Sequence, residues 1–470
     1  MPASTTTPGP ASGMEPLYAL RPRPLLRAFA TQGFAFWMAC VYLFFEYVRP
    51  QAIWSFLDVY PYWARTFILL ALIGWFLDPK RQFVWTRMST GISLFLGVII
   101  LASLTAYWPQ QSWAQFMGFF NWVVIFFVLT QTVTTRVRFY ILLLIFLLAS
   151  FKLSQHGARV WAMTGFSFSS WGLRGPQGFF QNPGELAIQM VVFAPIALFF
   201  CLAVAPYVKR WQLYLLYLMP LTAALTALGT NTRGGQIALA VQVLALILSI
   251  KQRFKALALV TILAVVGYHL LPEEQKLRFE QAGTDPTSEQ RLLYWQHGWQ
   301  MMKDHPALGV GYFNFIPYYN LHHSDDIILP MLQQRGSAEL PHNIFIQVGT
   351  DAGFIGLGLF LLLILGAFLT MRRLGQEAYA RGDPFVYNMA KGMNLALLGY
   401  VVAGQFVTVA YYPFLWIHLT FVTIMFHFWR TEQANALQAR QPFAPARAPR
   451  TQGEPVRGRP FVQVIKRDQG

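Results

Sequence analysis

The sequence predicts an all-α membrane protein whose chain crosses the bilayer many times. Hydrophobic residues make up 55% of its 470 residues and charged residues only 12%, and the mean hydropathy is +0.40. This composition is far from that of a soluble domain. Apolar stretches of roughly 15 to 27 residues recur along the chain, as membrane-spanning helices require.

We expect about twelve transmembrane helices, because twelve apolar stretches can be drawn. They cover residues 31–48, 62–77, 90–107, 116–134, 138–152, 185–205, 211–228, 235–250, 255–271, 344–370, 391–411 and 412–429. One large outer loop, 272–343, separates the ninth from the tenth. The expected domains are a disordered N-terminal tail over 1–30, a membrane domain over 31–430 and a disordered basic tail over 431–470.

The distribution of charge predicts the orientation. With the N-terminus in the cytoplasm, most of the 36 Lys and Arg residues fall on inner segments, and both termini are cytoplasmic. Because these basic residues are scattered over many short loops, we expect no nucleic-acid partner. Cys40 and Cys201 lie inside apolar stretches, so neither a disulfide framework nor a metal site is expected from them.

A histidine stands directly before the longest apolar run, in the order Pro341-His342-Asn343. Asn343 is a good N-cap residue, and the start of a helix carries partial positive charge and unpaired N–H groups. A base beside such a helix end suits chemistry on a negatively charged, lipid-borne substrate. The alternative is that His342 is an interfacial polar residue without a role.

Two further outer segments each carry an arginine. Arg174 lies in a Gly- and Pro-rich segment with Gln177 and Asn182, and Asn182-Pro183 also reads as a helix start. Arg233 lies in the short turn 229–234, where we expect it to be paired or to face a polar cavity. The alternatives are a solvated connector for Arg174 and snorkelling to the interface for Arg233.

The large outer loop contains a stretch, 291–299, that reads as a short amphipathic helix lying on the membrane and begins with Arg291. The glycine spacing at 309 and 311 is no dinucleotide fingerprint, since no strand precedes it. Adjacent histidines in a loop usually point apart, so we expect no metal at the four candidate ligands His322, His323, Asp325 and Asp326.

Four elements in this order resemble the O-antigen ligase and polymerase superfamily, the Wzy-C type domain, over about 170–370. They are the Arg174…Asn182-Pro183 segment, Thr232-Arg233-Gly234-Gly235, Arg291-xxx-Trp295 with Pro306-xx-Gly309-x-Gly311, and His342-Asn343-xxxx-Gln347-xx-Thr350-xx-Gly353. Two positions depart from the family pattern. Asp351 stands where members often have Glu at or near this position, which leaves its role open, and Gly184 stands where Asn is common.

The resemblance implies a glycosyltransferase of the GT-C type in a bacterial inner membrane, with the large loop in the periplasm. Such enzymes take a glycan from undecaprenyl diphosphate and attach it to lipid A–core, to a growing polysaccharide or to a protein hydroxyl. The chemistry of the residues fits this. His342 is the candidate base, and Arg233 and Arg291 are candidates to stabilise the diphosphate leaving group. Arg174, Asn343, Gln177 and Asn182 are candidate substrate-binding residues.

Because arginines can replace a divalent cation, we expect a metal-independent reaction without a cofactor, and direct attack on C1 implies inversion. The rival interpretation is a secondary transporter or a flippase for the same lipid. A transporter would be expected to show internal repeats and charged helices at mid-membrane. Ligase, polymerase and protein O-oligosaccharyltransferase are not distinguished by the sequence, because it does not display the acceptor.

Overall fold

The computed structural model describes residues 13–168, 172–270, 276 and 285–440, and within these ranges all regular structure is helical. The chain divides into two compact units, Met1–Trp429 and Arg430–Gly470. The first unit contains every residue of the candidate site.

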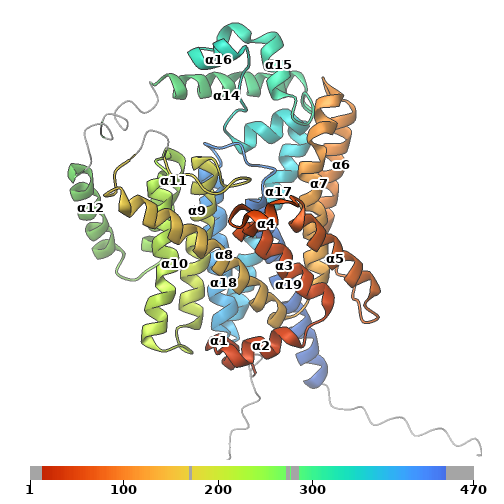
Figure 1. Ribbon diagram of the computed structural model, residues 1–470, viewed down its shortest axis with the longest axis vertical. Coiled ribbons are helices and arrows are strands. Elements are labelled where there is room, and N and C mark those ends of the chain that lie inside the picture. Colours follow the sequence, from red (N-terminus) through yellow and green to blue (C-terminus); the bar gives the residue numbers. More distant parts are fainter. Residues whose placement is uncertain (1–12, 169–171, 271–275, 277–284, 441–470) are drawn as a thin grey trace, which may run out of the picture. The chain divides into compact units, whose positions relative to one another are not determined.

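Each of the twelve expected apolar stretches overlaps a helix (Figure 1), although the stretch 391–411 extends beyond the end of its helix. These helices are α3 (Phe34–Val48), α5 (Trp63–Leu77), α6 (Arg87–Leu104), α7 (Pro109–Thr132), α8 (Arg136–Met163), α9 (Pro183–Val204), α10 (Arg210–Gly229), α11 (Arg233–Leu248), α12 (Arg253–Leu270), α17 (Ile344–Ala380), α18 (Pro384–Ala403) and α19 (Pro413–Arg440). Two short pieces, η1 (Pro50–Ala52) and α4 (Ser55–Asp58), join α3 to α5.

Six of these helices, in the described part of the chain, are long and apolar enough to cross a membrane: α6, α7, α8, α9, α10 and α17. The helices α5 and α11 are apolar but shorter. The chain is therefore a multi-pass membrane protein, as expected, while the number of twelve spans stays a prediction.

The expected N-terminal tail is not disordered throughout, because two helices, α1 (Glu15–Tyr18) and α2 (Pro22–Ala30), lie in it. The buried ring of Tyr18 stacks on Phe385 at 4.8 Å, and the hydroxyl of Tyr140 donates to the carbonyl of Leu17 at 2.9 Å. Burial of these aromatic side chains stabilises the segment, although its composition is typical of a disordered tail. Residues 1–12 and 441–470 lie outside the described residues, and α19 makes 431–440 helical.

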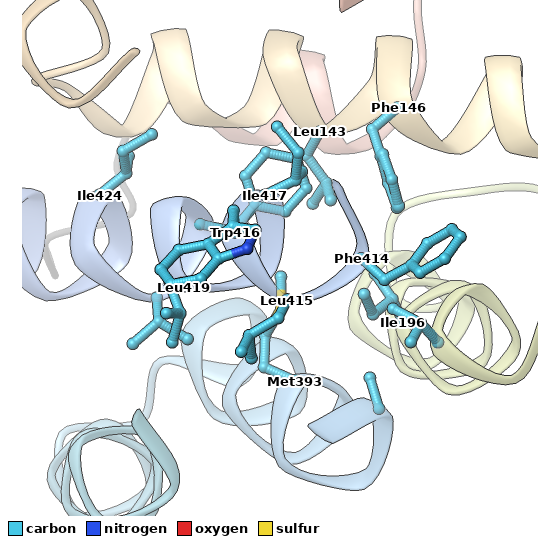
Figure 2. Close-up of a cluster of buried hydrophobic side chains, with 14 of the residues drawn as sticks. Leu143, Phe146, Ile196, Met393, Phe414, Leu415, Trp416, Ile417, Leu419 and Ile424 are labelled. Carbon is cyan, nitrogen blue, oxygen red and sulfur yellow. The ribbon is translucent and has the colours of Figure 1, made fainter. Parts of the chain in front are cut away.

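The core of the first unit is built around α19. Figure 2 shows Phe414, Trp416 and Ile417 of this helix among side chains of three neighbours: Leu143 and Phe146 of α8, Ile196 of α9 and Met393 of α18. The indole of Trp416 also packs against Phe119 of α7 at 4.8 Å.

The large outer loop folds as a small helical subdomain with its own buried residues. It contains α14 (Pro286–Asp304), α15 (Phe315–His322), η2 (Ser324–Asp326) and α16 (Pro330–Arg335). The aromatic side chains of Tyr294, Phe315 and Tyr319 pack together at its centre. The helix expected over 291–299 is thus present and longer, because Asp285 caps it by accepting from the Ser288 amide at 3.2 Å.

The helix α17 is broken at Gly353, which has φ 65° and ψ −168°. The helical bond from the Phe354 amide to the Thr350 carbonyl is replaced by two bonds to the outer loop. The Phe354 amide donates to the carbonyl of Pro306, and the amide of Val310 donates to the carbonyl of Thr350, both at 2.8 Å. The apolar run from 344 onward is therefore two helical pieces that meet at Gly353, where the backbone of the outer loop supplies the missing hydrogen-bond partners.

Candidate active site

Arg233 is the first residue of α11 and is held by the start of α14. Its Nη1 donates to Asp285 Oδ2 at 2.7 Å and to Ser288 Oγ at 3.1 Å. Burial raises the pKa of Asp285, but the hydrogen bonds from Ser288 and Arg233 outweigh it and lower that pKa to about 2. The expectation that Arg233 is paired is confirmed, and 31% of its side chain stays exposed.

Arg291 lies one and a half turns further along α14, within the electrostatic reach of Arg233, Asp285 and Glu339. Burial lowers the pKa of its guanidinium. In the part of the chain that the structure describes, its Nε is buried without a hydrogen-bond partner. A buried donor of this kind is costly unless a bound group accepts from it.

His342 is connected to this charged cluster through Glu339. Its Nε2 is 3.4 Å from Glu339 Oε2, and its backbone amide donates to Thr408 Oγ1 at 2.8 Å. The hydrogen bond from His342 holds the pKa of the Glu339 carboxyl below its usual range. The backbone of His342 is left-handed, with φ 52°, a conformation that non-glycine residues adopt rarely and often at functional sites.

The segment before His342 is tied to α14 by two aromatic side chains. The Glu339 amide donates to the hydroxyl of Tyr294 at 3.0 Å, and the indole of Trp295 donates to the carbonyl of Pro341 at 2.8 Å. The Arg291-xxx-Trp295 spacing thus has a structural reason. One turn of α14 carries both Arg291 and Trp295, and Trp295 holds the backbone of Pro341, the residue before His342.

Asn343 caps α17 as expected. Its Oδ1 accepts from the amides of Phe345 at 2.9 Å and Ile346 at 3.2 Å, and its Nδ2 donates to Gln405 Oε1 at 3.1 Å. Because both ends of this amide are used within the protein, Asn343 positions the helix start. A direct contact between Asn343 and substrate stays a prediction.

The connector 404–412, between α18 and α19, joins the starts of three other helices and was not expected from the sequence, which placed a span over 391–411. The Ile344 amide of α17 donates to the Gly404 carbonyl at 2.9 Å. A side chain in place of Gly234 would contact Phe406 of the connector, and one in place of Gly184 would contact Val407. The connector therefore brings the N-termini of α9, α11 and α17 together.

Arg174 lies beside the turn that precedes Arg233, because the Leu173 amide donates to the carbonyl of Gly229 at 3.2 Å. Arg174 is exposed and lines a cavity of about 670 Å³ between α8, this segment and the end of α10. Gln177 is also exposed. Asn182 caps α9 by accepting from the Gly184 amide at 2.9 Å.

A further arginine, Arg49, belongs to this region and was missed. Its guanidinium lies against Gly178, where any side chain would collide with it, and 5.9 Å from the ring of Phe179. Arg49 directly follows the apolar stretch 31–48 in the sequence, but its contact with a loop about 130 positions away was not visible there. Asp285, 52 positions from Arg233, was missed for the same reason, whereas Glu339 stands only three residues before His342 and its spacing was visible in the sequence.

Asp351 is almost fully buried in α17 and accepts from the Phe313 amide at 3.0 Å. This bond fixes the strained Phe313 backbone, which has φ 56°. Asp351 therefore helps to hold the outer loop on α17.

Two families match the chain, and they meet at this site. Residues 218–361 match the model described as O-antigen ligase (Wzy_C), and residues 24–203 match a family of unknown function (DUF5935). Arg233, Asp285, Arg291, Glu339 and His342 fall in the first match, whereas Arg174 and Arg49 fall in the second. The comparison with curated proteins gives no match.

Proposed function

We propose that this chain, which belongs to the O-antigen ligase family over residues 218–361, transfers a glycan from undecaprenyl diphosphate to an acceptor hydroxyl on the periplasmic face of the inner membrane. The observation that carries the proposal is the cluster of Arg233, Asp285, Arg291, Glu339 and His342 at the starts of three helices. It combines cations for a diphosphate with a base for a hydroxyl.

The leaving group gains charge as the bond between C1 and the diphosphate oxygen breaks. Arg233 and Arg291 approach this position from α11 and α14, and the capped start of α17 adds partial positive charge. The Nε of Arg291, which has no hydrogen-bond partner among the described residues, is a donor suited to a phosphate oxygen. Arg174, on the neighbouring segment, is placed to bind the remainder of the donor. No metal ion is required in this scheme.

His342 accepts the proton of the attacking hydroxyl. When its Nε2–H donates to Glu339, the ring nitrogen Nδ1 is left as the acceptor. Glu339 is then a positioning residue, which fixes the tautomer and favours the imidazolium that forms. Attack of the hydroxyl oxygen on C1 forms the new glycosidic bond as the diphosphate departs, so the configuration at C1 inverts.

The acceptor is lipid A–core, a growing polysaccharide or a protein hydroxyl. The cluster accounts for donor activation and proton removal in each case, and it contains no group that selects one of these acceptors.

The test uses the full chain reconstituted in lipid vesicles with a glycan linked to undecaprenyl diphosphate. We expect His342→Ala to lose transfer by about 10²–10⁴-fold while donor binding persists, because only the base is removed. Glu339→Gln should lose less, because it keeps an acceptor for the imidazole. His322→Ala, in the same loop but outside the cluster, is the matched control. Transfer by His342→Ala within about tenfold of the parent would refute the assignment of the base.

A further inference from the structure

Three possible metal ligands meet on the outer loop, away from the cluster described above. They are His297 of α14, His323 at the end of α15 and Asp326 of η2, and their ligand atoms all lie within 4.8 Å of one another. His297 Nε2 is 2.9 Å from Asp326 Oδ2, and the two imidazole rings stack with their centroids 3.9 Å apart.

The fold of the loop holds these residues in place. The Gln290 side chain donates to the carbonyl of Asp326 at 3.2 Å and accepts from the amide of Ile328 at 2.7 Å, which ties η2 to α14. The ring of Tyr319 lies 5.4 Å from both His297 and His323. The buried aromatic side chains of the loop therefore hold the three possible ligands close together.

The neighbouring residues of the same types point elsewhere. The His322 ring packs on Tyr318 at 4.4 Å and lies 6.5 Å from the ring of His323. Asp325 is exposed on η2. His322 is therefore not a member of the three-residue group, and the expectation of no metal overlooked His297, a possible ligand 26 positions earlier in the chain than His323.

We propose that His297, His323 and Asp326 bind one divalent transition-metal ion of the Zn²⁺ type, which links α14 to the segment 323–326. Two imidazoles and a carboxylate are a ligand set that zinc accepts, with bonds of about 2.0–2.2 Å. In a tetrahedral site of that size the ligand atoms are about 3.4 Å apart, so small side-chain rotations bring the three atoms into place. Asp326 is 47% exposed, which leaves room for water as the fourth ligand.

The role of this ion is structural. It joins α14 to the segment 323–326, which a small group of buried side chains and the hydrogen bonds of Gln290 otherwise hold together. The proposal does not depend on the proposed function, because the ion takes no part in transfer.

The test measures zinc on the full chain, purified without an oligohistidine tag and stripped with a chelator. We expect equilibrium dialysis to give one tightly bound Zn²⁺ per chain, and Zn²⁺ to slow proteolysis of the outer loop. His323→Ala and Asp326→Asn should each weaken binding by at least about 10–100-fold, since even an outer-sphere partner contributes that much. The matched controls His322→Ala and Asp325→Asn should bind as the parent does.

Binding that is absent from the parent, or equal in all four variants, would overturn the site. Because a variant could misfold, the His297→Cys variant, which keeps a zinc ligand, should restore protection by Zn²⁺ where His297→Ala does not. The two proposals fail separately. Absence of zinc with His342-dependent transfer intact refutes only the metal site, whereas transfer that needs metal equally in the parent and in His323→Ala refutes only metal-independent chemistry.

Discussion

At the scale of single residues, the candidate site is a balance of charges. Arg233 is neutralised in part by Asp285, and Glu339 offsets Arg291 and accepts from His342. The sequence singles out Arg233, Arg291 and His342 as candidates, because polar residues between apolar stretches stand out, and their roles stay predictions. It did not indicate Asp285, because an acidic residue in a polar loop carries no signal until folding brings it to a partner 52 positions away.

The arginines are expected to act through geometry as well as charge. Arg233→Lys and Arg291→Lys should each reduce transfer by roughly ten- to a hundredfold, because losing one charge-assisted hydrogen bond in the transition state costs about 1.5–3 kcal/mol. Lysine offers a point charge where arginine offers a planar fork. Arg174→Lys should also be impaired.

Initial rates at saturating donor check this expectation, and Arg335→Lys on α16 serves as a control on the same loop. Rates that are unchanged in all three variants would leave the diphosphate without an identified partner.

At the scale of elements, the outer loop packs closely on α17. Gly298 of α14 lies against Ile346, Gly349 of α17 lies against Met302, and residues 306–310 complete the hydrogen bonding at Gly353. Gly349 permits this close packing, because any side chain there would collide with Met302. The sequence did not predict the break, because a glycine in an apolar run reads equally well as a packing position.

Two tryptophans one turn apart on α14 allow two roles of this helix to be tested separately: Trp295 binds the segment before His342, and Trp299 is a candidate membrane anchor. Trp295→Phe removes the hydrogen bond to the Pro341 carbonyl, at a cost of about 0.5–1.5 kcal/mol. This substitution should reduce transfer, because the backbone of Pro341, directly before His342, is no longer held by α14. Trp299 is half exposed and makes no such bond to the residues that the structure describes, so Trp299→Phe should transfer as the parent does. Equal activity of the two variants in the vesicle assay would show that the Trp295 bond is dispensable.

The break in α17 is expected to require glycine. Gly353→Ala places a methyl group against the backbone of Ala307 and forces alanine to a φ of 65°, so it should destabilise the protein by at least about 1–3 kcal/mol. Gly358→Ala, in open space on the same helix, is the matched control and should be neutral or stabilising. Thermal unfolding of the purified variants in detergent measures the difference, and the idea fails if Gly353→Ala unfolds at the parent temperature.

At the scale of the whole molecule, the apolar pattern predicted where helices lie with few errors. It was less successful at their ends: α18 stops at Ala403, and the connector 404–412 is irregular. An apolar pattern cannot mark this boundary, because the connector is itself apolar: Val407 packs at the start of α9, and Val409 is buried.

The predicted orientation is tested with reporters. A reporter fused after Lys276 should behave as periplasmic and one after Arg381 as cytoplasmic, because most Lys and Arg residues then lie inside. A fusion after Lys209, also expected inside, is the control for the first half of the chain. Lys276 and Arg381 on the same side would contradict the twelve-span arrangement and separate the proposed site from the periplasm.

The break at Gly353 also bears on how the protein is made. Pro306 and Val310, which satisfy the interrupted helix, precede it in the chain and leave the ribosome before it does. If the loop has already been translocated when α17 enters the bilayer, the Pro306 carbonyl and the Val310 amide are already present to form hydrogen bonds with this helix. Synthesis from N- to C-terminus therefore supplies the partners in the order in which insertion needs them. A circular permutant that begins between α16 and α17 would reverse that order and present an incomplete helix to the lipid.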